Sequence, residues 1–505
     1  MTGRRAYAVA LASGVALSFA FPEPSLSPLA WIALAPLLVG LARPGGVSRG
    51  ALLGACFGIG FFGTLLVWVS VVGWVAWIVL VVVETAFVAV FAAATAWFLR
   101  SGTSVAYRVL VPAVLWVAVA EHLRSLVPVG GFSWGQLAQS QHDLGWMLKT
   151  ASLGGGWLVA LLIVVVNGLL AEALQRRSAG PRTAGFLLVI GIVLLAAPAA
   201  LPSNDATGDT IRVALVQGNV PRDFPGTSYE KEVTITRSHR ELTEDLAGRG
   251  IDVVFWPESS VGVDITGDPV VASEVGAAAR AVDAPLIVGA NLDVDEDHYQ
   301  VTALHVEPDG TIADVYVKTH LVPFGEYVPM RSLFGRLPIL DQVPRDAVAE
   351  DEVGLFEIQD ELIAPVLSYE GDFGALVRRR MDDGGRMLVV ATNTSTWGES
   401  WASAQHLAFS QVRAAETGVW VVHAAISGIS GLVAPDGAVQ ASLPLWEEGT
   451  IVRDIRFAED TTFYARVGEW VPALCYLIIA GLVARGALRW RRRGGDASTS
   501  PVAED

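Results

Sequence analysis

Long apolar stretches, each nearly free of charged side chains, occupy the first 200 positions of the chain and return once near its end. Eight of these stretches approach or exceed the length that crosses a bilayer as a helix. They lie at 6–21, 27–42, 50–71, 74–99, 105–122, 151–173, 184–201 and 468–488. The pattern predicts a membrane α-helical bundle of about eight spans, with about seven helices in residues 1–201 and the last one in 468–490.

Residues 202–467 have a different pattern, in which short apolar runs alternate with helical segments and turns. The strand candidates are 211–219, 251–256, 284–292, 299–307, 312–322, 362–370, 386–393 and 419–425. The helical candidates are 230–248, 271–282 and 403–417. The sequences EPDG at 307–310 and APDG at 434–437 are typical of hairpin turns. This alternation predicts an α/β layered domain that contains two buried sheets.

The positions of the basic residues favour one orientation in the membrane. With the N-terminus in the cytoplasm, every inner segment carries positive charge, as the positive-inside rule requires. These inner residues are Arg4, Arg5, Arg43, Arg49, Arg100, Arg108, Arg176, Arg177, Arg182, Arg489, Arg491, Arg492 and Arg493. Residues 202–467 are therefore expected on the extracytoplasmic side, and residues 491–505 are expected to form a polar cytoplasmic tail.

The composition favours a membrane protein and excludes some classes of function. Charged residues make up 17% of the chain, against about 25% in ordinary soluble proteins. Residues 201–466 hold 19 Lys and Arg against 42 Asp and Glu, and this acidic balance argues against nucleic acid as a partner. Cys56 and Cys475 lie in apolar segments, so no disulfide framework is expected. The histidines lack metal-ligand spacing, so neither a metal nor another cofactor is predicted.

Polar side chains follow three of the predicted strands. Glu258 follows the run IDVVF, Lys318 closes IADVYVK, and Ser368 follows LIAPVL. A carboxylate base, an ammonium that stabilises an oxyanion and a nucleophile that forms a covalent acyl intermediate together suit acyl transfer. Each signal alone is weak. A Glu after Pro is usually a cap or a surface residue, a Lys that ends a strand is usually solvated, and a lone Ser is usually a turn hydroxyl.

The order of three motifs makes the pattern more specific. FWPES (255–259), KTHLVPFGEYVP (318–329) and LSYEGDFG (367–374) resemble, in this order, the Glu-Lys-Cys motifs of the nitrilase (carbon–nitrogen hydrolase) superfamily. Because membrane spans lie on both sides of these motifs, nearly the whole chain resembles the bacterial apolipoprotein N-acyltransferase family. GGFSWGQLAQSQ (130–141) is similar to an extracytoplasmic loop of that family.

The resemblance implies a nitrilase-like α-β-β-α sandwich and a reaction at the bacterial inner membrane. In that family a phospholipid donates the acyl chain, and the N-terminal amine of a diacylglyceryl-cysteine lipoprotein accepts it. By position, Glu258 is the base, Lys318 is the cation that stabilises the oxyanion, and Ser368 occupies the nucleophile position. The supporting positions that the resemblance implies are Glu326, Tyr369, Glu370 and Asn393.

Ser368 stands where the family has a cysteine, and residues 202–467 contain no cysteine that replaces it. A serine hydroxyl needs a stronger base than a thiol, whose pKa is about 8.5, and an acyl-serine is less reactive toward an amine than a thioester. Three explanations remain open: an introduced Cys-to-Ser change, a natural homologue that uses serine slowly, and a homologue that has lost acyl transfer. Because Thr394, His423 and Ile426 also depart from the family pattern, a natural divergent homologue is favoured.

Two functions compete with acyl transfer at the level of the sequence. The first is a non-catalytic membrane scaffold, whose expected partner is a glycosyltransferase such as a polyprenol-phosphate mannosyltransferase. The second is a membrane-tethered amidase that hydrolyses a small amide. The second function suits the chain less well, because a small soluble amide does not require eight membrane spans.

Overall fold

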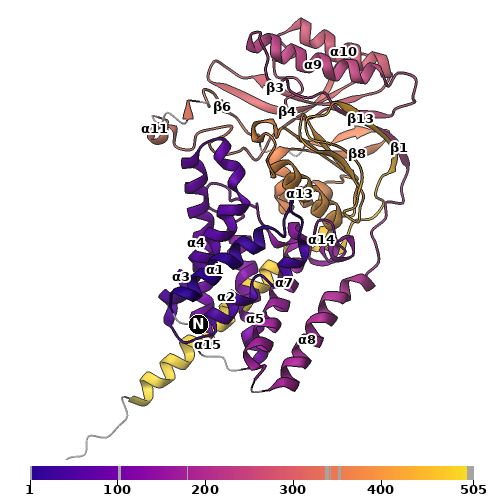
Figure 1. The fold of residues 1–505 in the computed structure, drawn as a ribbon. Helices are drawn as coiled ribbons and strands as arrows, with labels where there is room; N and C mark the ends of the chain where they lie inside the picture. Colours follow the sequence, from indigo (N-terminus) through magenta and orange to yellow (C-terminus); the bar gives the residue numbers. More distant parts are fainter. Residues whose placement is uncertain are drawn as a thin grey trace, which may run out of the picture.

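The computed structural model describes residues 3–100, 104–178, 180–335, 340–341, 343–350 and 354–497. In these residues, six helices are long and apolar enough to cross a membrane. They are α3 (Gly46–Leu65), α4 (Trp74–Phe98), α5 (Val105–Leu115, continued to Leu123 by a π-helix), α7 (Ala151–Arg176), α8 (Pro181–Ala196, continued to Ala200 by a 3-10 turn) and α15 (Trp470–Ala497). These helices stand below the soluble domain in Figure 1. The predicted helical bundle is thus confirmed.

Two of the predicted spans are shorter than the sequence pattern suggested. The pieces that replace the stretches 6–21 and 27–42 are α1 (Arg4–Ser18), a 3-10 turn (Ser27–Trp31) and α2 (Ala35–Leu41). A proline stands in the first turn of each of the last two pieces, Pro28 and Pro36. Proline fits the start of a helix but does not continue a preceding one, so one apolar stretch becomes two short elements.

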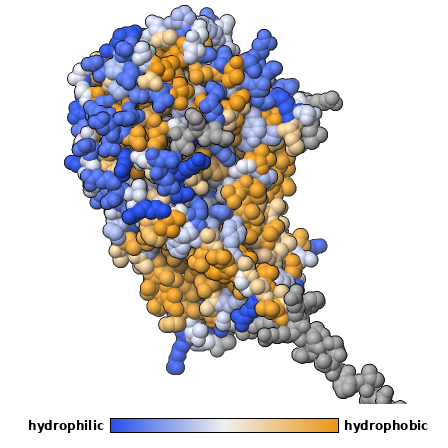
Figure 2. All heavy atoms as spheres, turned by 180° about the vertical axis from the view of Figure 1, so that it is seen from behind, coloured by the Kyte–Doolittle hydropathy of each residue, from blue (hydrophilic) through white to orange (hydrophobic). Residues whose placement is uncertain are grey.

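On the face that Figure 2 shows, apolar side chains cover the bundle, whereas polar side chains cover most of the soluble domain. Four large apolar residues on the bundle illustrate this surface: Trp74 is 63% exposed, Val79 57%, Ile192 64% and Leu477 70%. An exposed apolar surface of this extent matches contact with lipid rather than water. Helix α15 extends into the segment predicted as a polar tail, and residues 498–505 lie outside the described residues.

Two sheets form the centre of the soluble domain. In the described residues, the first sheet has the order β13-β1-β2-β3-β4-β5 with β6 beside β4, and the second has the order β12-β11-β10-β9-β8-β7. The strands of the first sheet are β1 (Thr210–Gln217), β2 (Val253–Phe255), β3 (Leu286–Asp293), β4 (His298–Val306), β5 (Ile312–Val317), β6 (Asp346–Ala347) and β13 (Gly449–Arg456). Those of the second are β7 (Phe356–Ile358), β8 (Glu361–Leu367), β9 (Met387–Thr392), β10 (Val421–Ala425), β11 (Ser430–Val433) and β12 (Val439–Leu443).

All eight predicted strands are present, and the two predicted turns join the antiparallel pairs β4–β5 and β11–β12. The prediction missed β6, β7, β11, β12 and β13. Most of these strands are short or lie at the edge of a sheet. For example, β13 is the edge strand of the first sheet, next to β1. Strands with one exposed face lack the continuous apolar run that marks a buried strand.

Helices cover the outer face of each sheet. α9 (Ser228–Glu244) and α10 (Pro269–Val282) lie on the first sheet, and α12 (Gly374–Asp382) and α13 (Ala402–Thr417) lie on the second (Figure 1). Between the sheets, Phe255 and Ile287 of the first sheet pack in one core with Leu367 and Val389 of the second. The domain is therefore the predicted α-β-β-α sandwich.

Helix α13 lies between the second sheet and the membrane bundle. Gln405 on this helix accepts hydrogen bonds from Trp68 Nε1 at 3.2 Å and Trp134 Nε1 at 2.6 Å, and its amide donates to the Pro22 carbonyl at 2.9 Å. Phe409 of α13 packs in the same apolar core as the bundle. The helix is buried on every side, and it thereby fixes the soluble domain on the bundle.

Candidate functional site

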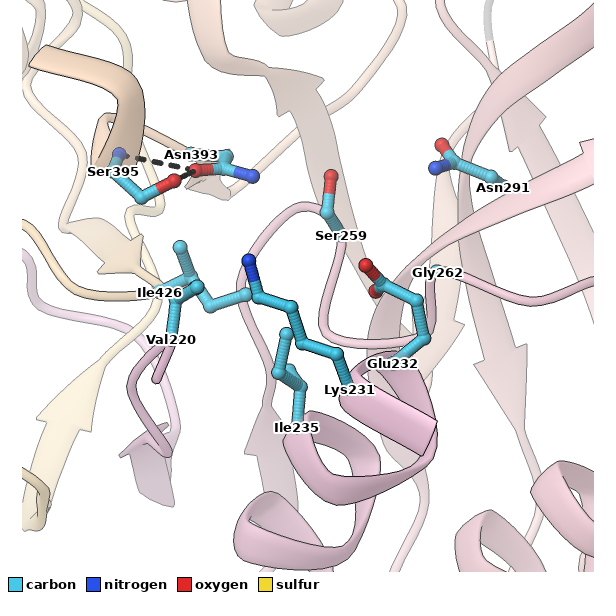
Figure 3. A pocket seen from close by; sticks show the side chains of 10 residues that line it. All are labelled: Val220, Lys231, Glu232, Ile235, Ser259, Gly262, Asn291, Asn393, Ser395 and Ile426. Atoms are coloured by element: carbon cyan, nitrogen blue, oxygen red, sulfur yellow. Dashed lines mark hydrogen bonds between the residues drawn. The ribbon is translucent and has the colours of Figure 1, made fainter. Parts of the chain in front are cut away.

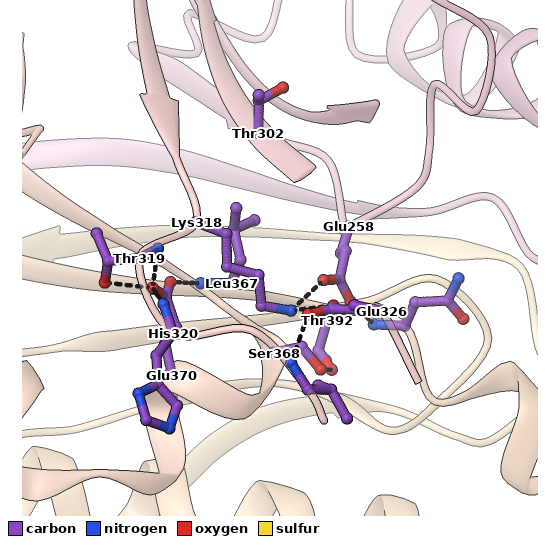
Figure 4. A network of polar contacts seen from close by, with 12 residues as sticks. Glu258, Thr302, Lys318, Thr319, His320, Glu326, Leu367, Ser368, Glu370 and Thr392 are labelled. Atoms are coloured by element: carbon purple, nitrogen blue, oxygen red, sulfur yellow. Dashed lines mark hydrogen bonds and ion pairs between the residues drawn. The ribbon is translucent and has the colours of Figure 1, made fainter. Parts of the chain in front are cut away.

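Four strands from the two sheets end at one place and deliver polar residues there. Glu258 follows β2, Lys318 follows β5, and Asn393 follows β9. Ser368 follows β8 and begins a 3-10 turn, Ser368–Asp372. Figure 4 shows the side chains of Glu258, Lys318 and Ser368 converging between the strand ends. The structure thus brings together the three residues that the strand-end pattern singled out.

Lys318 is the centre of the polar network. Its ammonium is fully buried and donates to Glu258 Oε1 at 3.0 Å and to Glu326 Oε1 at 2.5 Å. Burial by itself lowers the pKa of Lys318, but the negative charges of Glu258 and Glu326 outweigh burial and raise this pKa above its usual value. The lysine is therefore held as a cation in a site from which water is largely excluded.

The two carboxylates differ in their surroundings. Glu258 Oε2 accepts the backbone N–H of Asn393 at 2.9 Å, and Glu326 Oε2 accepts the backbone N–H of Val322 at 2.7 Å. Burial raises the pKa of Glu326, a shift that Lys318 opposes and Glu258 reinforces. The Asn393 side chain points elsewhere, because its oxygen accepts from the Ser395 hydroxyl at 2.6 Å. Asn393 thus orients Glu258 through its main chain.

Ser368 adopts a backbone conformation that is rare for a residue with a side chain. Its φ angle is 48°, in the left-handed region. Its Oγ atom accepts a 3.1 Å hydrogen bond from the Thr392 hydroxyl, and among the described residues neither Glu258 oxygen forms a hydrogen bond with it. In the described part of the chain, the Ser368 hydroxyl is therefore hydrogen-bonded to Thr392, as Figure 4 shows.

Glu370 braces the loop that carries Lys318. Its carboxylate accepts from the Thr319 backbone N–H and hydroxyl, both at 2.8 Å, and from the His320 N–H at 3.1 Å. It also accepts from the Tyr316 hydroxyl and from the backbone N–H of Leu367 at 2.8 Å. These bonds join the end of β5 to the end of β8. Glu370 thus organises the site and does not face its reacting side.

Tyr369 connects the site to the membrane part of the chain. Its hydroxyl donates a 2.7 Å hydrogen bond to the Gly131 carbonyl, in the loop 130–141 that follows α5 and its π-helix. Arg124 holds the same loop, because its guanidinium donates to the carbonyls of Phe132 and Trp134, both at 2.8 Å. The residue next to Ser368 is therefore fixed to the bundle by a direct contact.

Comparison with known proteins places both halves of the chain. Residues 13–169 match the apolipoprotein N-acyltransferase N-terminal domain, and residues 212–462 match the carbon-nitrogen hydrolase domain. An apolipoprotein N-acyltransferase from Geobacter metallireducens is 30% identical over 510 residues, which cover 97% of this chain and 96% of the relative. The corresponding protein of Gloeobacter violaceus is 30% identical over 504 residues, with coverage of 96% and 94%.

The chain belongs to the apolipoprotein N-acyltransferase family. It is a multi-pass membrane enzyme of that type, with a nitrilase-like domain on a helical bundle. The hydrolase match contains all seven site residues that the sequence singled out, and the N-terminal match contains the loop 130–141 that Tyr369 contacts.

This apolipoprotein N-acyltransferase-type protein has a pocket of about 240 Å³ next to the polar network of Lys318. Lys231 and Glu232 of α9 line it together with Ser259 and Asn393 (Figure 3). Ser259 directly follows Glu258 in the chain, so the pocket adjoins the candidate base. Burial raises the pKa of Glu232, and Lys231 opposes this shift. The pocket thus offers a carboxylate, an ammonium and amide groups to a polar ligand.

Sequence reasoning missed the polar residues behind Ser368, namely Thr392, His406 and Asp372. His406 Nδ1 lies 3.4 Å from the Thr392 hydroxyl, and His406 Nε2 lies 3.3 Å from Asp372 Oδ1. No spacing rule identifies this group, because its members come from β9, from α13 and from the turn after β8. In the described part of the chain, no three His, Cys, Asp or Glu residues are grouped as metal ligands.

Proposed function

We propose that this protein transfers an acyl chain from a phospholipid to the N-terminal amine of a diacylglyceryl-cysteine lipoprotein, through an ester on Ser368. The observation that carries the proposal is the buried ammonium of Lys318, held by Glu258 and Glu326 beside the turn that begins at Ser368. A fixed positive charge in a site shielded from water stabilises the oxyanion that forms when a carbonyl is attacked.

Each residue has a separate role in this reaction. Ser368 attacks the acyl carbonyl, Glu258 acts as general base, and Lys318 stabilises the oxyanion. Glu326 keeps Lys318 charged and in place, since it is the second carboxylate on the ammonium. Tyr369 fixes the nucleophile turn to the bundle through Gly131.

The two substrates approach from different sides. The phospholipid enters laterally from the outer leaflet, where the loop 130–141 joins the bundle to the site. The polar end of the lipoprotein lies in the pocket beside Glu258, where the Glu232 carboxylate attracts its amine. This arrangement requires that residues 202–467 lie on the extracytoplasmic side, between the bundle of residues 1–201 and the final helix, with the segment from 491 in the cytoplasm.

Serine at the nucleophile position makes the second half of the reaction slower than in a cysteine enzyme. The acyl-serine is an oxyester, and an amine attacks an oxyester less readily than a thioester. We therefore expect the acyl-enzyme to accumulate when phospholipid is supplied without an acceptor.

The decisive test uses purified protein, phosphatidylethanolamine and a synthetic diacylated lipopeptide. Mass spectrometry of the lipopeptide should show the mass of one added acyl chain at its amine. The Ser368→Ala variant should give no product, whereas Ser368→Cys should give product faster. A wild-type protein that produces as little as Ser368→Ala would contradict the proposal.

One observation favours a second function, which is that of a catalytically impaired scaffold for a glycosyltransferase or another membrane partner. That observation is Ser368 itself, because an alcohol is a weaker nucleophile than a thiol. A scaffold predicts no acyl transfer by the wild-type protein, a gain of transfer in Ser368→Cys, and co-purification of a glycosyltransferase with the wild-type chain.

A further inference from the structure

A second pocket, of about 380 Å³, adjoins the pocket that Glu232 lines. Val220 and Ile235 line both, so the two pockets share a wall. Figure 3 shows these two side chains on the wall of the first pocket, close to Lys231. The second pocket has the size of a site for a small ligand, and the reaction proposed above leaves it without an occupant.

The two pockets follow one edge of the first sheet, in the order of its strands. Ser259, in the loop after β2, lines the first pocket. The second pocket is lined by the loop 218–222, which follows β1, and by residues of the loop 444–448, which precedes β13. Because β1 is parallel to β2 and antiparallel to β13, these loops lie at the same edge of the sheet. The pockets therefore form a track that leads away from Glu258.

Hydrogen bonds hold the two loops of the second pocket together. Asn219 Nδ2 donates to the Trp446 carbonyl at 2.9 Å, and Gln217 Nε2 donates to the carbonyls of Pro444 at 2.9 Å and Glu447 at 2.7 Å. Asn219 and Trp446 have φ angles of 66° and 63°, in the left-handed region, which is rare for a residue as bulky as tryptophan. Backbone strain of this kind is concentrated at ligand-binding sites and persists only where the surroundings impose it. The wall of the pocket is therefore formed before a ligand binds.

Arg222 carries hydrogen-bond donors that are available to a ligand in this pocket. Its guanidinium lies over the Trp446 ring, 4.3 Å from the ring centroid, and this stacking orients the planar group. Among the described residues, one side chain accepts a hydrogen bond from it, Glu399 at 2.8 Å. The side chains of this pair are 52% and 70% exposed, and an exposed ion pair is weak. A guanidinium has five N–H donors, so most of those of Arg222 remain for a ligand.

In the reaction proposed above, the polypeptide of the acceptor must leave the first pocket. The amine of the acceptor lies near Glu232, and its diacylglyceryl group remains in the membrane. The chain after the cysteine therefore needs a separate path, away from the bundle. An extended segment advances about 3.3 Å per residue and carries one main-chain carbonyl in each residue. These carbonyls need donors where they leave water, and the second pocket provides donors at Arg222.

We propose that the second pocket binds the first residues of the lipoprotein polypeptide, directly after the cysteine that is acylated. The proposal rests on the acyl transfer function given above, and it specifies how the acceptor is recognised. Arg222, held against Trp446, donates to main-chain carbonyls of the bound segment. Because every residue carries a carbonyl, this mode of binding depends on the length of the segment more than on its side chains.

The test measures the binding of two acceptors to full-length Ser368→Ala protein in lipid nanodiscs, because this variant lacks the proposed nucleophile. One acceptor is a diacylglyceryl-cysteine amide, and the other carries four neutral residues after the same cysteine. Both carry the same lipid, so they partition equally into the bilayer. Competition against a fluorescent copy of the longer acceptor should give a Kd about tenfold lower for the longer acceptor, the gain expected from about one charged hydrogen bond.

Two variants probe the second pocket independently. Arg222→Met removes the donors but keeps a side chain that packs on Trp446, and Thr234→Trp fills the pocket from α9. Each should reduce the difference between the two acceptors to less than about threefold and leave the Kd of the amide unchanged. Arg237→Met is the matched control, because Arg237 forms an exposed ion pair with Glu274 and lines neither pocket in the part of the chain that the structure describes. This control should keep the tenfold difference.

Binding and transfer are measured separately, so a failure of this proposal differs from a failure of the acyl transfer function. A tenfold preference for the longer acceptor, in a protein whose wild-type form N-acylates neither acceptor, would support the peptide site and contradict acyl transfer. Equal Kd values for the two acceptors would overturn the peptide site. So would a preference that survives both Arg222→Met and Thr234→Trp, or an Arg222→Met protein that binds both acceptors equally more weakly.

Discussion

The Tyr369 hydroxyl donates a 2.7 Å hydrogen bond to the Gly131 carbonyl, and this bond joins the residue after Ser368 to the membrane bundle. Tyr369 is buried, and its ring packs against His320 and Phe373. Under the proposed function, a phospholipid that enters beside Gly131 arrives at the loop that contacts the residue after Ser368. The contact joins the soluble domain directly to a loop of the bundle.

We predict that Tyr369→Phe slows the formation of the acyl-enzyme about tenfold, which corresponds to the loss of about one hydrogen bond. The ring and its packing remain, so the thermal midpoint in detergent should change little. Single-turnover acylation by phosphatidylethanolamine measures the rate, and differential scanning fluorimetry measures the midpoint. An unchanged rate would show that the Gly131 contact does not position the nucleophile turn.

Replacement of Lys318 by Met should affect both activity and stability. The change removes the oxyanion-stabilising cation and leaves Glu258 and Glu326 facing each other without a counter-charge. We expect no detectable acyl-enzyme and a loss of about 3–5 kcal/mol in the free energy of unfolding. Lys231→Met, which removes a lysine outside this network, is the matched control and should retain acylation. A Lys318→Met protein that acylates normally would exclude the proposed role.

Much of this site was predictable from the sequence, for a physical reason. Buried strands appear as continuous apolar runs, so the polar residues Glu258 and Lys318 mark the strand ends. The His406 contact was not predictable, because it depends on how α13 packs against the second sheet. The span expected at 27–42 was overestimated, because Pro28 and Pro36 each begin a separate short element within that apolar stretch.

The soluble domain should lose stability in acid because of His239. Its Nε2 accepts from the Gly218 N–H at 3.1 Å while Nδ1 donates to the Ile235 carbonyl at 2.8 Å, so the folded domain holds the neutral ring. Burial lowers the pKa of His239 to about 4, against about 6.5 in an unfolded chain. Protons therefore bind the unfolded state preferentially between these two values.

The stabilisation from neutral His239 is complete above pH ~6.5 and decreases as the pH falls toward about 4, by up to about 3 kcal/mol. Thermal unfolding from pH 7 to pH 4.5 measures this decrease. His239→Gln retains an acceptor for Gly218 but does not titrate in this range, so its thermal midpoint should fall less steeply. Equal slopes for the two proteins would exclude His239 as the cause.

Glu232→Gln should weaken the use of the lipopeptide acceptor. The substitution retains the size of a side chain that lines the pocket and removes the charge that attracts an amine. We expect the KM for the lipopeptide to rise about three- to tenfold, the range for an exposed to partly buried charge contact. The rate of acylation by phospholipid should remain the same. A change in acylation with an unchanged KM would place the acceptor elsewhere.

The ester on Ser368 is the central claim of this account, and peptide mapping tests it directly. Purified wild-type protein is incubated with phosphatidylethanolamine of one defined acyl chain, without acceptor, and is then digested and analysed by tandem mass spectrometry. The account predicts the mass of one acyl chain on Ser368, removed by hydroxylamine and absent from Ser368→Ala. An unmodified Ser368, or an acyl chain on another residue, would contradict it.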